Sequence, residues 1–223
     1  MSERPLPEWD ALIASAAHLQ KIIPDAVLVG GTAAASYAHH RVSMDHDHAL
    51  GDLRTRFDGI LAELESVAGR KTARVKRPAL ILGSLDGIET GIRQLIRETP
   101  LETAQVEVNG VTLTLPTREE MLRIKAVLVL KRNATRDYLD FAALSDLLGE
   151  AGTIRAMMRF DALYPQPNGA SAIQQLQIQL ANPMPFDLDD TDLAEYKLLD
   201  PKWQDWNTVK TVCASLSLAL NDA

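Results

Sequence analysis

The chain has 223 residues, of which 46% are hydrophobic and 24% are charged. This length is about one and a half average domains, and the composition is that of a folded protein with a sizeable core. Disordered, collagen-like and coiled-coil chains are therefore excluded. The net charge is −7, so we expect nucleic acid to bind only through a local basic patch.

The cysteine content and the apolar runs bear on the compartment. A single cysteine, Cys213, excludes a disulfide framework and a multi-cysteine zinc site, and it indicates a reducing compartment. No apolar run approaches the length of a membrane span, so we expect no membrane partner. The N-terminal stretch has charges on both sides of a short Ala-rich segment, which favours a helix over a signal peptide. We therefore expect a cytoplasmic protein.

The first half of the chain mixes helix and strand patterns. Apolar residues at helical spacing alternate with short apolar runs, one of which ends in Gly30-Gly31. Asp86-Gly87 and Asn109-Gly110 predict hairpin turns, since both central residues of such turns need positive φ. The predicted helices are 9–23, 32–39 and 53–67, and the predicted strands lie within 26–29, 41–50, 79–82, 88–96, 104–108 and 111–115.

From Pro116 onward the pattern is helical. Thr117 and Glu120 form a capping box at the start of one helix. Thr135 is expected to cap a second helix, which Gly149 ends, and the last helix is expected over about 203–220. The predicted fold class is α+β, with a mixed sheet and flanking helices over 1–115 and a helical C-terminal region over 116–223.

The most informative pattern combines Gly30-Gly31 with Asp45-His46-Asp47. Side chains alternate faces along a strand, so Asp45 and Asp47 share one face about 7 Å apart. Two such carboxylates repel each other unless a cation lies between them, and Mg²⁺ typically binds one or two carboxylates together with substrate phosphates. A Gly-Gly turn before a helix lets backbone N–H groups approach an anion. The pattern therefore predicts a site for a metal–triphosphate complex.

The histidines raise two alternatives. Four of the five lie within ten residues, which is compatible with a transition-metal site, and His46-Asp47 is compatible with an HD-type phosphohydrolase. Both are disfavoured, because His46 and His48 would point away from the carboxylates and the remaining His18 lies upstream. The four clustered histidines are His39, His40, His46 and His48.

This arrangement resembles the nucleotidyltransferase fold shared with DNA polymerase β, in which a strand, a Gly-Gly turn, a short helix and an Asp-x-Asp strand follow one another. It is most similar to the AbiEii toxin branch, which adds a small residue and Ala after the glycines, Arg-x-Ser before the acidic pair, and a later Lys, Arg and Lys/Arg-Asp-x-x-Asp. The likeness covers about residues 10–150. The matching segments are Gly30-Gly31-Thr32-Ala33, Arg41-Val42-Ser43-Met44-Asp45-His46-Asp47, Lys125, Arg132 and Arg136-Asp137-Tyr138-Leu139-Asp140.

The resemblance implies transfer of a nucleoside monophosphate from an NTP, with release of pyrophosphate. Asp45 and Asp47 would bind Mg²⁺, and Lys125 would join them in catalysis by neutralising the triphosphate. An alternative for Arg132, Asp137 and Asp140 is an ion-pair network between two helices. The expected nucleotide-binding set is Gly30, Gly31, Thr32, Ser43, Lys125, Arg132 and Asp137.

The resemblance also implies an RNA acceptor, with tRNA the leading candidate, and a toxin role with a separate antitoxin. A basic cluster over 70–77 is either a solvated face or a surface that steers RNA. Two alternatives stay open: a small-molecule, antibiotic-type nucleotidyltransferase, and a degenerate nucleotide-binding module. The expected RNA contacts are Arg70, Lys71, Arg74, Lys76 and Arg77.

A third carboxylate usually comes from a later strand in this superfamily. We expect that strand within 89–96, where Gln94 aligns best with the acidic position. Glu89 and Glu107 are the substitutes. A site without a third carboxylate would favour the degenerate interpretation.

Overall fold

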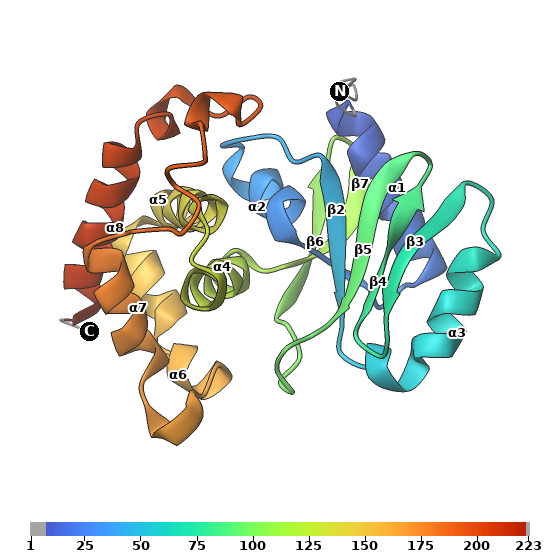
Figure 1. The fold of residues 1–223 in the computed structure, drawn as a ribbon, viewed down its shortest axis with the longest axis horizontal. Coiled ribbons are helices and arrows are strands. Elements are labelled where there is room, and N and C mark those ends of the chain that lie inside the picture. The colour runs from blue at the N-terminus through green and yellow to red at the C-terminus, as the bar shows by residue number, and fades with distance from the viewer. Residues whose placement is uncertain (1–7, 222–223) are drawn as a thin grey trace. The chain divides into compact units, whose positions relative to one another are not determined.

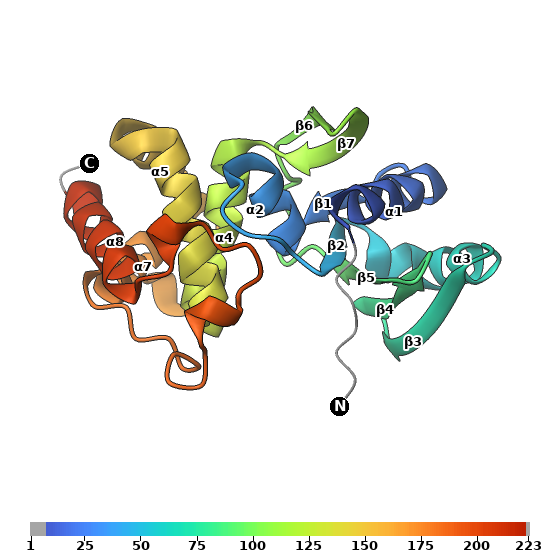
Figure 2. The same cartoon turned by 90° about the horizontal axis from the view of Figure 1, so that it is seen from above.

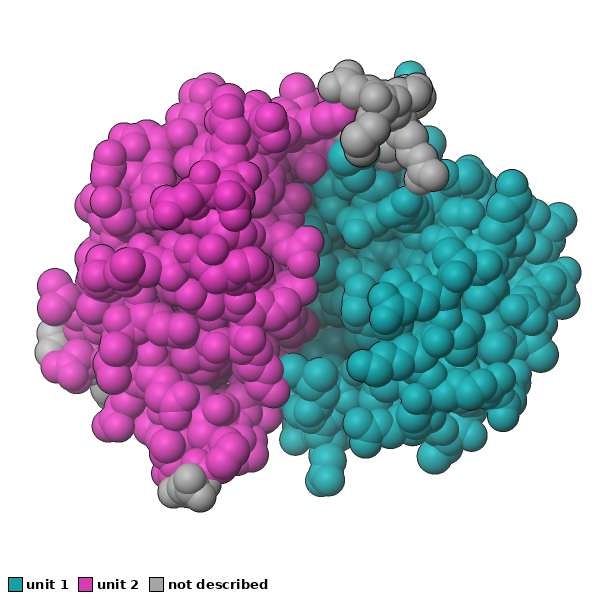
Figure 3. Space-filling model, in the orientation of Figure 1, with its two compact units in different colours: residues 1–36, 43–116 teal, residues 37–42, 117–223 magenta. Residues whose placement is uncertain are grey.

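The computed structural model describes residues 8–221, and the chain divides into two compact units (Figure 3). The first unit comprises residues 1–36 and 43–116, and the second comprises residues 37–42 and 117–223. The sequence placed a single boundary between residues 115 and 116. In the structure the main boundary lies between Pro116 and Thr117. The short segment 37–42 belongs to the second unit, although it comes early in the chain.

The first unit is built on a mixed β-sheet and a separate hairpin (Figure 1). The strands are β1 (Val27–Val29), β2 (Asp45–Leu50), β3 (Arg70–Lys76), β4 (Leu80–Leu85), β5 (Ile88–Gln94), β6 (Thr103–Val108) and β7 (Val111–Pro116). The five-stranded sheet has the order β1-β2-β5-β4-β3, and β6 pairs with β7. β2 and β5 run parallel, whereas the other neighbours run antiparallel.

Two helices cover one face of this sheet. They are α1 (Trp9–Ile22) and α3 (Leu53–Glu65), and Figure 2 shows both on the same side. Their apolar residues pack on the strands in a core that includes Leu19, Ile23, Leu50, Phe57, Ile60, Leu64, Ile81, Leu85 and Ile92. A further helix, α2 (Gly30–Ala38), follows β1 directly without a connecting loop. The sheet therefore has one face in the core and one face that carries charged side chains.

Both predicted hairpin turns are confirmed. Asp86 and Gly87 have φ values of 53° and 83°, and Asn109 and Gly110 have values of 48° and 77°. Glycine and asparagine tolerate this left-handed conformation better than other residues do. The turns therefore join β4 to β5 and β6 to β7, as the sequence indicates.

The second unit is helical. Its long helices are α4 (Arg118–Arg132), α5 (Thr135–Met157), α7 (Ala172–Ala181) and α8 (Trp206–Asn221), with α6 (Phe160–Leu163) and the 3₁₀ turns Pro167–Gly169, Leu193–Glu195 and Pro201–Trp203. Large buried side chains such as Tyr138, Phe141 and Phe160 fill its core. Cys213 lies there too, and burial raises the pKa of its thiol to about 12.

The predicted fold class, an α+β core with a mixed sheet and flanking helices before a helical region, is confirmed. The Thr117 cap is also confirmed, since its side chain accepts a hydrogen bond from the Glu120 N–H. The Thr135 cap is wrong: Ala134 is the N-cap, and the carboxylate of Asp187 accepts the N–H and hydroxyl of Thr135. A tertiary contact replaces the local cap.

One predicted helix end is confirmed and one differs. Gly149 has a non-helical φ of 68° and ends the first of two helical segments that meet at a kink within α5. The last helix begins at Trp206, because Trp203 belongs to a preceding 3₁₀ turn. Across residues 8–221, none of the helices combines the length and the apolar character that crossing a membrane requires.

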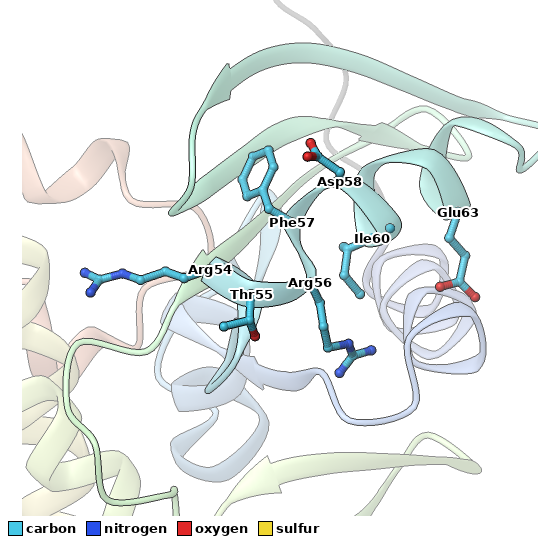
Figure 4. Close-up of a pocket in the computed structure, with 8 residues that line it drawn as sticks. Arg54, Thr55, Arg56, Phe57, Asp58, Ile60 and Glu63 are labelled. Carbon is cyan, nitrogen blue, oxygen red and sulfur yellow. The ribbon is translucent and has the colours of Figure 1, made fainter.

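A shallow pocket of about 450 Å³ lies along α3 (Figure 4). All its lining residues come from this one helix, including Arg54, Arg56 and Glu63. The Arg56 guanidinium is paired with Asp25 and Asp52. Because α3 packs on the core face of the sheet, this pocket is separate from the predicted Asp-x-Asp site.

Candidate metal and nucleotide site

The two predicted metal ligands lie on one face of β2. Asp45 is exposed, Asp47 is partly exposed, and the alternating His46 and His48 are fully buried on the opposite face. This is the alternation that the sequence predicts for a strand. The carboxylates therefore project from the face of the sheet that α1 and α3 do not cover.

His46 and His48 are core residues. The ring of His46 is held by the hydroxyls of Ser15 and Thr90, at 3.0 and 3.2 Å from Nε2 and Nδ1. Burial lowers the pKa of His46 to about 4 and holds the pKa of His48 well below its usual value. Neither ring faces the carboxylates, so the structure gives no support to a histidine metal site here.

Two glycines lie beside Asp47, and one of them, Gly91, makes room for its carboxylate. Gly30 has a φ of +78°, and a Cβ there would lie 3.5 Å from the Asp47 Cβ. Gly91 on β5 pairs with Asp47, and a Cβ at Gly91 would lie 2.2 Å from Asp47 Oδ1. Any side chain at Gly91 would therefore force the carboxylate to move.

The acidic residue of β5 that lies next to Asp45 is Glu89. The prediction that Gln94 occupies the position of the third carboxylate is wrong. The parallel register pairs Glu89 with Asp45, whereas Gln94 pairs with Leu50, which points into the core. The Gln94 amide accepts the Arg54 N–H at 2.9 Å and donates to the Gly51 carbonyl, so it fixes the start of α3. Glu107 lies on the separate β6-β7 hairpin.

The residues of the exposed face form three rows of cross-strand neighbours. Each row begins on β2 and crosses β5 and β4 to the edge strand β3. β2 and β3 are three strand spacings apart, about 14 Å. The rows are Asp45–Glu89–Ser84–Lys71, Asp47–Gly91–Leu82–Arg74 and Ala49–Arg93–Leu80–Lys76. We call this surface the carboxylate face.

A β-bulge turns the basic cluster toward this face. The register shifts between Thr72 and Arg74, so one extra residue on β3, Ala73, changes the side to which the following residues point. Lys71 before the bulge and Arg74 and Lys76 after it consequently share the carboxylate face. All three are exposed.

The other two members of the cluster lie elsewhere. The Arg70 guanidinium is over Gly83, where a Cβ would come within 2.9 Å of Nη2, and burial lowers the pKa of Arg70. Arg77 pairs with Asp58 on α3, and its guanidinium lies 5.0 Å from the Phe57 ring centroid. These two arginines therefore belong to the helix-covered side of the unit.

The residues predicted to bind phosphate lie where β1 passes directly into α2, with Gly30 as the first residue of the helix. N–H groups in the first turn of a helix lack intrahelical acceptors and favour anions. The Thr32 hydroxyl is buried and donates to the Asp45 carbonyl, so only its N–H remains for such a role. The Ser43 hydroxyl donates to Asp45 Oδ1 at 3.0 Å and orients that carboxylate.

The donor set fits Mg²⁺ with substrate phosphates better than a metal cage made by the protein alone. Within residues 8–221, no group of three or more His, Cys, Asp or Glu side chains is gathered as a metal site. Mg²⁺ needs only one or two carboxylates when waters and phosphates complete its octahedron. Asp45 and Asp47 would supply those carboxylates, and Glu89 pairs with Asp45 in the sheet register.

The remaining predicted residues form a charge network in the second unit, in which Lys125, Asp137 and Asp140 are buried and Arg132 is exposed. Asp140 is fully buried. Its carboxylate accepts hydrogen bonds from His40 Nε2 at 2.8 Å, Arg41 Nε at 2.7 Å and Lys125 Nζ at 2.6 Å. Burial alone would raise the pKa of Asp140. The charges of Arg41 and Lys125 and the His40 hydrogen bond outweigh it and hold the pKa well below its usual value.

Asp137 extends this network. It is fully buried, lies 3.8 Å from Lys125 Nζ and accepts two hydrogen bonds from Arg132, at 2.8 and 3.1 Å. This is the ion-pair network that the sequence left open as an alternative. The Lys125 side chain is only 3% exposed, and its ammonium is paired with the Asp140 carboxylate.

Sequence reasoning missed Gly91 and Arg93. Arg93 Nε donates to Asp47 Oδ1 at 3.3 Å. Glu89, Gly91 and Arg93 alternate along β5, so one strand face carries a carboxylate, a residue without a side chain and a cation. This period of two in the sequence could have identified Gly91 and Arg93 as neighbours of the Asp-x-Asp pair.

The chain is similar to segments of longer proteins. No family model matches it. It is 29% identical over 228 residues to the heme uptake protein MmpL11 of Mycobacterium tuberculosis, covering 94% of this chain and 22% of that protein. It is 32% identical over 127 residues to the mycolic acid-containing lipids exporter MmpL11 of Mycolicibacterium smegmatis, covering 56% of this chain and 13% of that protein. The chain thus spans at most about a fifth of these relatives.

One solved structure is also similar. It is an antigenic nucleotidyltransferase-like protein from Paracoccidioides brasiliensis, with a TM-score of 0.49 and 16% identity, covering 88% of this chain and 97% of that one.

Gly91→Ala is expected to weaken divalent-cation binding. The added Cβ would displace the Asp47 carboxylate, and Mn²⁺ affinity should fall by about tenfold, as for other groups that position metal ligands. Titration with Mn²⁺ monitored by electron paramagnetic resonance measures this. The control is Gly59→Ala on α3, where the Cβ would meet nothing within 4 Å. Unchanged Mn²⁺ affinity in Gly91→Ala would contradict the assignment of Asp47.

Asp140→Asn is expected to destabilise the second unit by about 3–5 kcal/mol, because it leaves buried cations without their carboxylate. The pKa of Asp140 is depressed, so its contribution is present above about pH 4 and is lost as the pH falls through the folded-state pKa. Urea unfolding followed by tryptophan fluorescence between pH 7 and pH 3 measures both effects.

The matched control is Asp146→Asn on the same helix. Asp146 is 50% exposed and pairs with Lys202, so its loss should cost less than about 1 kcal/mol. Equal costs for the two variants would show that the buried network does not stabilise this unit.

Proposed function

We propose that the chain is a metal-dependent nucleotidyltransferase whose reacting groups lie on the carboxylate face. The observation that carries this proposal is the position of Asp45 and Asp47 on one face of β2, with Asp47 beside Gly30 at the start of α2 and Glu89 paired with Asp45 in the parallel register. Two carboxylates on one strand face next to a helix N-terminus suit a metal–triphosphate substrate. The site of the proposal is thus contained within the first unit.

Each group has a defined role in this proposal. Asp45 and Asp47 hold Mg²⁺, which supplies charge neutralisation for the triphosphate. First-turn N–H groups of Gly30, Gly31 and Thr32 bind phosphate oxygens. Glu89 accepts the proton of the acceptor hydroxyl as the new bond to the α-phosphorus forms and the bond to pyrophosphate breaks.

The second unit takes a structural role in this proposal. Lys125 and Arg132 are already engaged by Asp137 and Asp140. We therefore assign them no contact with the nucleotide. The buried network instead stabilises the packing of α4 against α5.

The acceptor in this proposal is a polynucleotide, with tRNA as the leading candidate. Lys71, Arg74 and Lys76 are exposed on the same face as the carboxylates, although the chain is acidic overall. Cations arranged along a strand suit a chain of phosphates, whereas a small-molecule acceptor has no need of them. Arg70 and Arg77 are left out of this surface because both contact the helix-covered side.

The biological setting is proposed on the resemblance to AbiEii toxins alone. It comprises growth inhibition by acceptor modification in the cytoplasm, and a separate antitoxin protein. The proposal does not include the heme uptake or lipid export for which the MmpL11 relatives are named, because the chain spans 22% or less of those proteins.

The proposal is tested with α-labelled NTPs, Mg²⁺ and total tRNA on a denaturing gel. Asp45→Asn and Asp47→Asn are each expected to reduce labelling by about 100-fold or more, because they remove charge that positions the metal complex. Glu89→Gln is expected to cost roughly 100-fold through loss of the base. Glu107→Gln, on the separate hairpin, is the matched control and should retain full activity.

The outcomes separate the alternatives. Label on RNA that disappears in Asp45→Asn supports the proposal and identifies the nucleotide. Label only on added small molecules would favour the antibiotic-type enzyme. Mg²⁺-dependent NTP binding with no labelled product would favour the degenerate module.

Removing the positive charges on β3 is expected to weaken the binding of RNA and to leave the binding of NTP unchanged. Lys71→Gln, Arg74→Gln and Lys76→Gln together should weaken RNA binding, and should lower the slope of log K against log salt by about 0.7 for each lost phosphate contact. Lys21→Gln, Arg54→Gln and Lys131→Gln together give the same change in net charge at other exposed sites. Equal losses in both triple variants, measured by filter binding at several salt concentrations, would refute a specific basic surface.

A further inference from the structure

Arg93 lies on the carboxylate face and contacts one of the proposed metal ligands. It follows Gly91 by two residues on β5, so both residues lie on the carboxylate face. Gly91 is in the row of Asp47, and Arg93 is in the next row, opposite Ala49. Arg93 Nε is 3.3 Å from Asp47 Oδ1, and the two side chains are 49% and 26% exposed. Because Gly91 has no side chain, β5 presents nothing that separates the guanidinium from the carboxylate.

A guanidinium and a divalent cation compete for the same oxygen. Asp47 Oδ1 accepts from Arg93, and it also belongs to the carboxylate proposed to hold Mg²⁺. Ion pairs this exposed contribute little free energy in water, so a bound cation can displace the arginine easily. A displaced guanidinium near the site is well suited to a phosphate, since its planar fork binds two phosphate oxygens at once.

We propose that Arg93 exchanges partners when the metal–nucleotide complex binds. Without that complex it pairs with Asp47, and with it bound Arg93 binds oxygens of the triphosphate. This inference rests on the proposed function and adds a phosphate-binding residue that is also a competitor for the metal. Its consequence is that a divalent cation alone binds weakly, whereas the cation and the nucleoside triphosphate bind cooperatively.

Two binding measurements with opposite expected signs test the exchange. Mn²⁺, titrated without nucleotide and followed by electron paramagnetic resonance, should bind Arg93→Gln about two- to fivefold more tightly than the wild type, since the competing ion pair is gone. Non-hydrolysable α,β-methylene analogues of the four NTPs, titrated calorimetrically in saturating Mg²⁺, should bind Arg93→Gln about tenfold more weakly. Arg54→Gln, which removes an exposed arginine from α3, is the matched control and should leave both affinities unchanged.

The results that overturn the inference are distinct from those that overturn the proposed function. An Arg93→Gln variant that weakens both ligands, or changes neither, refutes the exchange of partners. When the wild type binds Mn²⁺ and Asp47→Asn abolishes that binding, such a result refutes the role of Arg93 alone. If the wild type binds neither Mn²⁺ nor any analogue, the proposed function fails and this inference fails with it.

Discussion

The parallel pairing of β2 with β5 is the constraint on which the first unit depends. His48 and Leu50 on β2, and Ile92 on β5, are buried beneath α1 and α3, which fixes the register of both strands. A slip of one residue would exchange the two faces and bury carboxylates in the core. The hydrophobic packing on one face therefore determines which charged groups meet on the other.

The same residue types act differently in the two units because their surroundings differ. On the carboxylate face, Lys71 and Asp45 are exposed to water and available to a ligand. In the second unit Lys125 and Asp140 are buried and compensate each other at 2.6 Å. A buried charge is tolerated only when it is paired, so burial converts potential ligands into structural groups.

Much of this arrangement follows from local sequence. The period-two alternation placed Asp45 and Asp47 opposite the histidines, and the Asp-Gly and Asn-Gly pairs gave the two hairpins, because those effects operate within a few residues. Gln94 was assigned wrongly since counting along a motif does not give the register between distant strands. The bulge after Thr72 and the cap that Asp187 gives to α5 depend on tertiary contacts, which a local pattern does not contain.

The burial of Lys125 illustrates the same limit. Lys125 fits the later motif in sequence, but helical spacing alone does not say whether a lysine on α4 contacts solvent or carboxylates. Its partners Asp137 and Asp140 lie on the next helix, and a third group, Arg41, comes from a segment some eighty residues earlier in the chain. Only the assembled second unit shows that these charges are paired.

That early segment has an evolutionary consequence. Residues 37–42 belong to the helical unit, so the chain passes between the units three times: after Ser36, after Val42 and after Pro116. A gene fusion or recombination event with a single crossover near residue 116 would separate His40 and Arg41 from Asp140. The two units are therefore expected to be inherited together, and exchange of the C-terminal half alone would require matching changes in the short inserted segment.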